Sequence, residues 1–111
     1  AWWNRRFVRE GRVILQQGNA TDLPYPDPVF HAAVAIDTAP FWPDLPRGLA
    51  ELHRVLRPSG RVVVVVQPRD DHDADWWRER LVRGLVEAGF SEVNGLVGPN
   101  GAAGAFGRKP R

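Results

Sequence analysis

The sequence predicts an α/β fold with a mainly parallel sheet, and three observations lead to this prediction. Apolar runs typical of strands alternate with amphipathic stretches typical of helices, as in parallel sheets covered by helices. Five consecutive valines, residues 62–66, indicate a central buried strand, because β-branched side chains disfavour a helix. Two runs near the C-terminus, residues 91–97 and 103–108, flank a Gly/Pro/Asn turn and predict an antiparallel hairpin.

Length and composition indicate one soluble domain. The chain has 111 residues, of which 43% are hydrophobic and 25% charged, as in globular proteins. It has no cysteine, so it forms no disulfide or thiolate metal site, which fits a cytoplasmic protein. No apolar run reaches the ~20 residues that span a membrane. Methionine is also absent, so we expect the chain to be processed or cut from a longer polypeptide.

Residues 1–10 are expected to be the last turns of a helix. Trp3 and Phe7 are four residues apart and share one helical face, and Gly11 stands where a C-terminal cap belongs. Further elements are expected in order: a strand at 12–17, a proline-rich loop at 18–29, and an apolar strand at 30–36 that is buried on both faces.

Two amphipathic helices are expected in the rest of the chain. Asp44 is the N-cap of the first, and Pro58 with Gly60 ends it before the strand at 61–66. The second covers residues 74–88 and is capped by Gly89. Their apolar stripes consist of Leu45, Leu49, Leu52 and Leu56 in the first helix, and of Trp77, Leu81, Leu85 and Ala88 in the second.

Three segments in this order resemble the class I S-adenosylmethionine-dependent methyltransferases, in particular the type 11-like enzymes that act on small molecules. Residues 11–30, GRVILQQGNATDLPYPDPVF, resemble the family's third strand and the loop after it. Residues 37–64, DTAPFWPDLPRGLAELHRVLRPSGRVVV, carry the most specific motif. Residues 84–93, GLVEAGFSEV, resemble a late helix and the strand after it.

The resemblance implies a Rossmann-like methyltransferase fold in truncated form. The family's sheet order is 3-2-1-4-5-7-6, and the five expected strands correspond to strands 3, 4, 5, 6 and 7. Residues 1–111 would then be a single domain that is the C-terminal part of the fold. The first two strands and the glycine-rich loop are absent, so we expect an opening in the middle of the sheet. Unpaired edges are costly, which favours a homo-oligomer such as a dimer, a rearranged sheet, or a missing N-terminal segment.

The cofactor implied by the resemblance is S-adenosylmethionine. The turn formed by Gly18, Asn19, Ala20 and Thr21 would meet its adenine, with Asn19 in place of the usual acidic residue. An asparagine side-chain carbonyl still accepts a hydrogen bond. Alternatively, Asn19 only shapes the turn. Because the glycine-rich loop is absent, we expect this chain alone to bind the cofactor weakly or not at all, and to be inactive.

Candidate catalytic and substrate-pocket residues follow the second strand. Asp37 is the candidate general base, needed only where the methyl acceptor must lose a proton. It could instead bind the substrate or cap the following turn. Thr38, Phe41 and Trp42 are candidates for the substrate pocket, although aromatic side chains at this spacing also suit a core.

Other polar clusters have simpler explanations. The run at 69–75 holds His72 among four carboxylates, but it precedes a helix, where aspartates act as caps, and we predict no metal site. His53 is expected on a helix surface, and Ser59 replaces a glycine of the family's Pro-Gly-Gly turn. The net charge is only +2, and the arginines at 5, 6, 9 and 12 are the only clustered cations, so nucleic acid is not an expected partner.

The leading hypothesis is therefore a fragment or truncated form of an S-adenosylmethionine-dependent methyltransferase that acts on a small molecule. The alternative is a non-catalytic methyltransferase-like module for oligomerisation or partner binding. The sequence does not identify the methyl acceptor.

Overall fold

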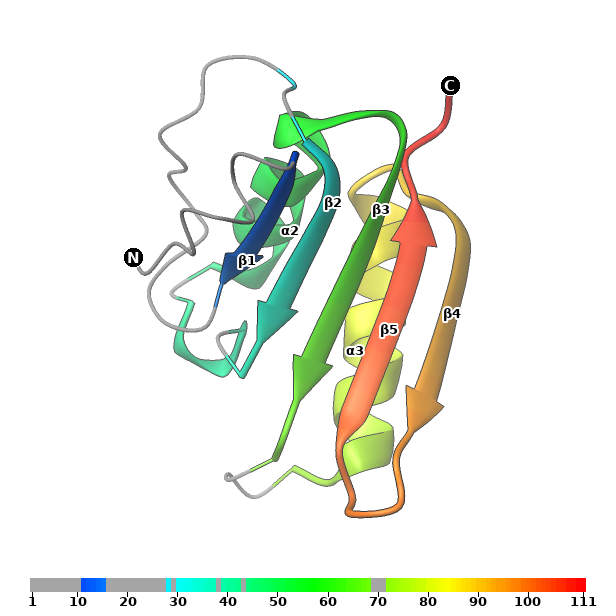
Figure 1. The fold of residues 1–111 in the computed structure, drawn as a ribbon. Coiled ribbons are helices and arrows are strands. Elements are labelled where there is room, and N and C mark those ends of the chain that lie inside the picture. Colours follow the sequence, from blue (N-terminus) through cyan, green and yellow to red (C-terminus); the bar gives the residue numbers. More distant parts are fainter. Residues whose placement is uncertain (1–10, 16–27, 29, 38, 43, 69–71) are drawn as a thin grey trace.

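The computed structural model describes residues 11–15, 28, 30–37, 39–42, 44–68 and 72–111. The expected helix at 1–10 and almost all of the loop at 18–29 lie outside these residues. The described elements, shown in Figure 1, are in chain order β1 (Arg12–Leu15), β2 (Phe30–Ile36), the 3-10 helix η1 (Ala39–Phe41), α2 (Leu45–Val55), β3 (Leu56–Val66), α3 (Ala74–Glu87), β4 (Ser91–Val97) and β5 (Ala103–Arg108).

The described strands form one sheet with the order β1-β2-β3-β5-β4. β1, β2 and β3 are parallel, and β5 lies antiparallel between β3 and β4, which confirms the terminal hairpin. The expected opening in the sheet is wrong for the described strands, which show the rearranged sheet that was one of the alternatives. Val13 pairs with Ala33 and Ile14 with Val34, so β1 lies directly against β2. This pairing gives hydrogen-bond partners to backbone groups of β2 that an opening would leave unpaired.

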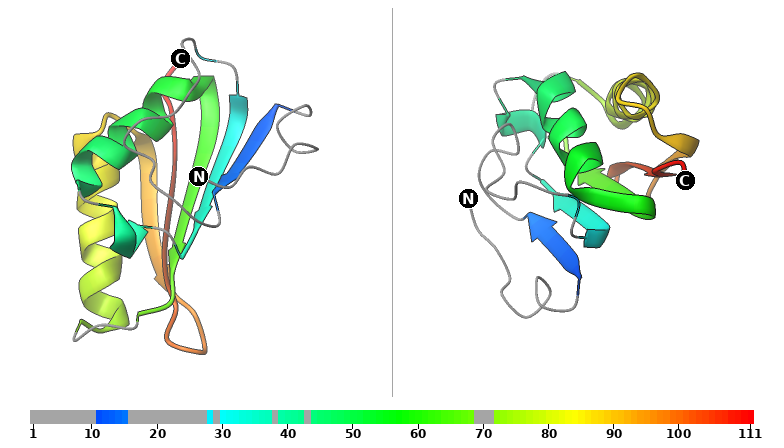
Figure 2. Two further views of the ribbon diagram at one scale, coloured as in Figure 1. Left: turned by 90° about the vertical axis from the view of Figure 1, so that its left-hand side faces the viewer. Right: turned by 90° about the horizontal axis from the view of Figure 1, so that it is seen from above.

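Both α-helices cover the same face of the sheet (Figure 2). The side chains of β3 alternate accordingly: Val62, Val64 and Val66 are fully buried toward the helices, whereas Val63 is 37% exposed. Burying a valine stabilises the fold by roughly 1.5–3 kcal/mol, so this row is a substantial part of the core. The core also includes Leu49, Leu52, Leu81 and Leu85 from the two helices.

The opposite face of the sheet has no described helix over it, and we call it the open face. It carries the side chains that alternate with the buried rows of β2, β3, β5 and β4, namely Val34, Ile36, Val63, Val65, Phe106 and Leu96. Ile36 is 37% exposed, Phe106 40% and Leu96 51%. The expectation that residues 30–36 are buried on both faces is therefore wrong, because only the side of Ala33 and Ala35 meets the helices.

Helix α2 begins as expected and ends earlier. The Asp44 carboxylate caps it by accepting a hydrogen bond from the Arg47 backbone N–H at 3.1 Å. The helix ends at Val55, and Leu56 is already extended, as the first residue of β3. The expected stop at Pro58 and Gly60 is therefore wrong: both lie within β3.

The C-terminal tail explains why the chain is extended at the start of β3. Lys109 continues the antiparallel ladder, since its N–H donates to the Gly60 carbonyl and its carbonyl accepts from the Ser59 N–H, both at 2.8 Å. The Lys109 ammonium also donates to the Leu56 carbonyl at 2.8 Å. Ser59 has φ +68°, in the left-handed region that a glycine adopts without strain.

Helix α3 follows the sequence prediction closely. The Asp73 side chain accepts from the Trp76 N–H at 2.9 Å and caps the first turn. Trp77, Leu81 and Leu85 form its buried stripe. Gly89, with φ +104°, lies just past its end, as expected of a C-terminal cap.

Candidate functional site at the carboxyl ends of the strands

The parallel strands β2 and β3 end at the same edge of the sheet, which we call the carboxyl edge. Asp37 follows β2 and Gln67 follows β3. Both α-helices begin at this edge, with their capping residues Asp44 and Asp73 (Figure 1). Ligands of open α/β sheets bind beyond the carboxyl ends of the strands, where helix N-termini also contribute positive dipole ends. The carboxyl edge is therefore the candidate site.

Asp37 ties the ends of the two strands together. Its Oδ1 atom accepts a hydrogen bond from the Gln67 N–H at 2.6 Å, and its own N–H donates to the Val65 carbonyl at 2.8 Å. The side-chain amide of Gln67 donates a second hydrogen bond, to the backbone carbonyl of Asn100 at 3.2 Å. Asp37 has φ +54°, a conformation that aspartate tolerates better than most residues. One carboxylate oxygen thus has a structural role, and the other makes no hydrogen bond to a described residue.

Trp42, the candidate pocket residue that follows η1, lies in the core. It is 6% exposed, and its ring packs so closely on α2 that a Cβ atom at Gly48 would lie 2.4 Å from Trp42 Cε3. The indole Nε1 is buried and has no hydrogen-bond partner among the described residues. A buried unpaired N–H costs about 1–3 kcal/mol. Trp42 is therefore a core residue packed on α2 in this arrangement, rather than part of an exposed surface.

The first turns of α3 add an aromatic cluster that the sequence analysis missed. The His72 and Trp76 rings are stacked with centroids 3.5 Å apart, and the Arg80 guanidinium carbon lies 5.2 Å from the Trp76 ring centroid. Trp76 is 37% exposed, whereas Trp77 is buried. Trp76 and Arg80 are four residues apart on α3 and share one helical face, which is the signal that could have identified this pair, whereas His72 precedes the N-cap Asp73.

Several predicted site residues lie outside the described part of the chain. These are the adenine turn formed by Gly18, Asn19, Ala20 and Thr21, the pocket candidate Thr38, and the side chain of Phe41. Among the described residues, Asp37 lies at the carboxyl edge and Trp42 is buried against α2. No group of three potential metal ligands occurs within the described residues.

The pKa values that are clearly shifted belong to residues far from the carboxyl edge. Burial lowers the pKa of His53, and the charge of Lys109 lowers it further, while a backbone hydrogen bond with Gly89 acts in the opposite direction. The His53 ring packs edge-on against Phe90, with centroids 4.9 Å apart, so this residue of the helix surface is partly buried. Burial also lowers the pKa of Lys109.

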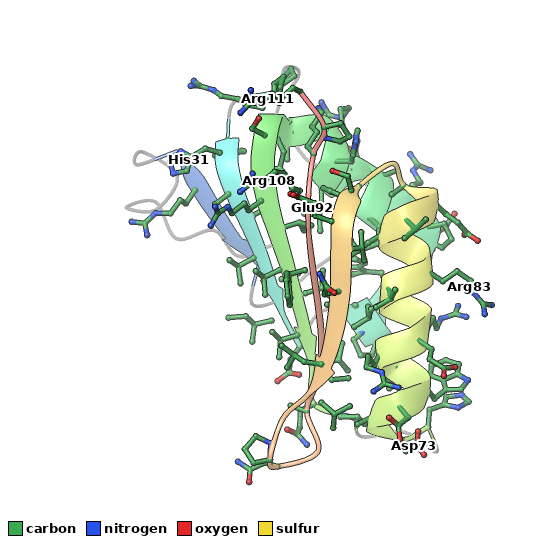
Figure 3. All side chains as sticks on the ribbon, turned by 90° about the vertical axis from the view of Figure 1, so that its right-hand side faces the viewer. His31, Asp73, Arg83, Glu92, Arg108 and Arg111 are labelled. Carbon is green, nitrogen blue, oxygen red and sulfur yellow. The ribbon has the colours of Figure 1, made fainter. Side chains whose placement is uncertain are left out.

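Two surface hollows also lie away from Asp37 and Trp42. One, of about 520 Å³, lies between α3 and β4 and is lined by Arg78, Glu79, Val82, Arg83 and Gly95. The other, of about 250 Å³, lies over β3, β4 and β5 and is lined by Arg61, Glu92, Asn94, Phe106, Gly107 and Arg108. Figure 3 shows Arg108 and Glu92 near each other on the sheet, with Arg83 projecting from α3.

Comparison with known families identifies the fold. Residues 1–64 match the family described as "Methyltransferase domain", which is more than half of the chain. The chain belongs to the class I methyltransferases. The matched part of this methyltransferase chain contains β1, β2, Asp37, Trp42, α2 and most of β3, and therefore the described part of the candidate site.

Several curated relatives are named as methyltransferases of hydroquinones or menaquinone precursors. The chloroplastic 2-methyl-6-phytyl-1,4-hydroquinone methyltransferase 2 of rice is 33% identical over 91 residues, covering 73% of this chain and 26% of the relative. The demethylmenaquinone methyltransferase of Deinococcus radiodurans is 42% identical over 56 residues, covering 50% of this chain and 23% of the relative. The methyltransferase chain thus spans about a quarter of the length of these relatives.

Solved structures support the same fold. A Thermotoga maritima S-adenosylmethionine-dependent methyltransferase, described as a possible histamine N-methyltransferase, has a TM-score of 0.64 and 23% identity, covering 83% of this chain and 62% of its own. The CurJ carbon methyltransferase has a TM-score of 0.67 and 15% identity, covering 86% of this chain and 35% of its own. Within the described residues, no helix of the methyltransferase chain is long and apolar enough to cross a membrane.

Proposed function

We propose that this chain contributes the acceptor-side half of an S-adenosylmethionine-dependent methyltransferase that acts on a small molecule. The observation that carries the proposal is the family match over residues 1–64, which includes the carboxyl edge with Asp37. Relatives named for hydroquinone and demethylmenaquinone substrates favour an acceptor of similar size. The absence of cysteine in the sequence favours a cytoplasmic location.

The cofactor supplies an electrophilic methyl group on a sulfonium, and the protein mainly has to orient the two reactants. The turn from Gly18 to Thr21 would hold the adenine, with the Asn19 side chain accepting from its amino group. The described residues fit only the acceptor side of such a site. Asp37 stands at the carboxyl edge, with one oxygen held by Gln67.

Asp37 would act on the methyl acceptor through its other carboxylate oxygen. That oxygen could take the proton of an acceptor hydroxyl or amine, or orient the acceptor by accepting its hydrogen bond. The bond between Oδ1 and the Gln67 N–H fixes the carboxylate in place, so that little rotational freedom is lost on binding. Thr38, Phe41 and Trp42 would form the walls and the base of the pocket.

The first test of this proposal is cofactor binding by the chain itself. We expect S-adenosylmethionine to leave the thermal unfolding of the 111-residue chain unchanged, because the part of the fold that holds its methionine end has no counterpart in the sequence. A longer protein that contains this chain should be stabilised, by about 2.7 kcal/mol at a hundredfold excess of ligand over Kd. The measurement is differential scanning fluorimetry, with ATP as the control ligand. Failure of the longer protein to bind would contradict the proposed function.

A non-catalytic role in oligomerisation is the alternative, and the outer strands favour it. β1 and β4 are the edges of the described sheet, and each presents a row of backbone groups to which another copy could pair. Light scattering distinguishes the two functions. A dimer that forms without cofactor, together with no cofactor binding by the longer protein, would support the alternative.

A further inference from the structure

We propose that the hollow over β3, β4 and β5 binds the carboxylate of a small molecule that also carries an apolar group. The hollow has a volume of about 250 Å³, and its lining consists of Arg61, Glu92, Asn94, Phe106, Gly107 and Arg108. Along the extended chain of β3, Arg61 lies about 20 Å from Gln67 at the carboxyl edge. The hollow is therefore separate from the acceptor site of the proposed function.

Two arginine side chains lie next to each other in this hollow, because Arg61 and Arg108 are directly opposite across β3 and β5. The Lys109 N–H donates to the Gly60 carbonyl, so the hydrogen-bonded pair lies one step further along the ladder. Arg61 and Arg108 are therefore a non-hydrogen-bonded pair, in which Cα atoms are about 4.5 Å apart. Like charges placed directly opposite are destabilising. A bound carboxylate removes this repulsion, and guanidinium groups bind carboxylates through two parallel hydrogen bonds.

The charges of the lining indicate which anion the hollow suits. The Glu92 carboxylate lies 3.5 Å from Arg108 Nε, as Figure 3 illustrates. Arg61 makes no hydrogen bond or ion pair with another described residue. Two positive side chains and one negative side chain leave a single positive charge. A carboxylate, with one negative charge, balances it, whereas a phosphate dianion would exceed it and be repelled by Glu92.

A bulge in β4 accounts for the position of the Glu92 carboxylate. Ser91 pairs with Arg108, and Asn94 pairs with Phe106. In this stretch β4 therefore has one residue more than β5. Glu92 lies in the bulge with φ +53°, in the left-handed region that is strained for a glutamate. Bulges redirect side chains and are frequent beside functional sites. The strained backbone thus keeps a carboxylate beside the arginine pair, where it sets the charge of the hollow.

Phe106 provides a contact surface for the apolar group of the ligand. Its ring is 40% exposed, and the pair of Phe106 and Val63 is next to the arginine pair on the open face. The Asn94 side-chain amide donates to the Glu92 carbonyl at 3.4 Å, and its second N–H is available to a ligand. Pockets for drug-sized ligands measure about 300–1,000 Å³. The smaller hollow therefore suits a ligand of about the size of benzoate.

Titration of the full chain with benzoate tests the proposal, with the backbone amide signals in two-dimensional NMR spectra as the readout. We expect the signals of Asn94 and Gly107 to shift until they saturate at millimolar benzoate, while that of Gln67 stays in place. Acetate, which lacks the ring, and benzamide, which lacks the charge, should each bind about tenfold more weakly or less. The absence of saturable shifts would overturn the proposal. Equal affinities for benzoate, acetate and inorganic phosphate would also overturn it, because they would show only a general attraction of anions to arginine.

Variants of the lining charges should change the affinity for benzoate in opposite directions. Arg61→Gln should raise the Kd about tenfold or more, whereas Arg47→Gln, which removes the same charge from the exposed surface of α2, should leave it unchanged. Glu92→Gln should lower the Kd, because it removes the carboxylate that competes for Arg108. A folding defect does not produce tighter binding, so this variant tests the site independently of stability. Unchanged affinity in the Arg61 and Glu92 variants would contradict the proposed site.

Discussion

At the scale of single residues, the described non-glycine residues with positive φ lie at the ends or bends of strands. Asp37 follows β2, Ser59 lies in the first part of β3, and Glu92 lies beside the bulge of β4. Asp37 and Ser59 are held by hydrogen bonds to a distant part of the chain. Strained backbone conformations persist where surrounding contacts fix them, and Asp37 is the one of the three at the candidate site.

Substitutions of Asp37 should separate its structural role from its chemical one. Asp37→Asn keeps an acceptor for the Gln67 N–H and tolerates the left-handed conformation, so the free energy of unfolding should change little. Asp37→Ala removes the acceptor and should lower the free energy of unfolding by about 1–2 kcal/mol. Urea titration measures both values.

The same pair of variants tests catalysis in a longer, cofactor-binding protein. If Asp37 is the base, the asparagine variant should lose activity although its stability is retained. Equal stability of the alanine and wild-type chains would contradict the structural role assigned to the carboxylate.

At the scale of elements, the two helices owe their positions to caps as well as to apolar stripes. Asp44 and Asp73 each accept a hydrogen bond from the backbone three residues ahead, at the edge where the candidate site lies. The caps therefore fix the helix N-termini relative to the strand ends. Close packing of α2 and α3 on one face follows from small residues: a Cβ atom at Gly84 would lie 2.5 Å from Leu49 Cδ1.

Removing the capping carboxylate of α3 should lower the free energy of unfolding more than removing a neighbouring carboxylate. Asp73→Ala eliminates the acceptor of the Trp76 N–H and should destabilise the chain by about 1 kcal/mol. Asp75→Ala is the matched control, since Asp75 makes only an exposed ion pair with Arg78 at 3.2 Å, worth about 0–1 kcal/mol. Equal losses in urea titrations of the two variants would argue against a capping role for Asp73.

The sequence predicted most elements, because their signals are local. The apolar stripes of both helices, the five-valine strand and the terminal hairpin were all recognised from spacing. The end of α2 was misplaced because Leu56 continues the helical stripe, whereas the hydrogen bonds that extend the chain there come from Lys109. The bond between Asp37 and Gln67 was also unpredictable, since it depends on the register that pairs Ile36 with Val65.

At the scale of the whole molecule, the pKa of His53 in α2 depends on residues far away in the sequence, because the charge of Lys109 lowers it. His53 of α2 packs on Phe90, and Lys109 reaches the first residue of β3. Because burial lowers the pKa of His53 below its usual 6.5, the folded state binds a proton less readily than the unfolded chain. The stability contributed by neutral His53 is therefore complete above pH 6.5 and is lost as the pH falls through this value toward the lower pKa of the folded state.

The lowered pKa of His53 predicts that the free energy of unfolding depends less on pH in the His53→Gln variant. Between about pH 7.5 and pH 5 the free energy of unfolding should fall less in the variant than in the wild-type chain. If the free energy of unfolding changes with pH to the same extent in the His53 variant and the wild-type chain, the lowered pKa of His53 is contradicted.

The position of β5 between β3 and β4 has a consequence for how the chain is assembled during synthesis. β4 is made before β5, yet its described partner strand is β5, so it has no place in the sheet until residues 103–108 have emerged. β3 likewise lacks one of its two neighbouring strands until β5 has been made, so one side of the five-valine run is unpaired. Exposed strand edges of this kind are prone to aggregation. β5 therefore completes two pairings at once, with β3 and with β4, and until it has been made this edge of the five-valine run stays unpaired.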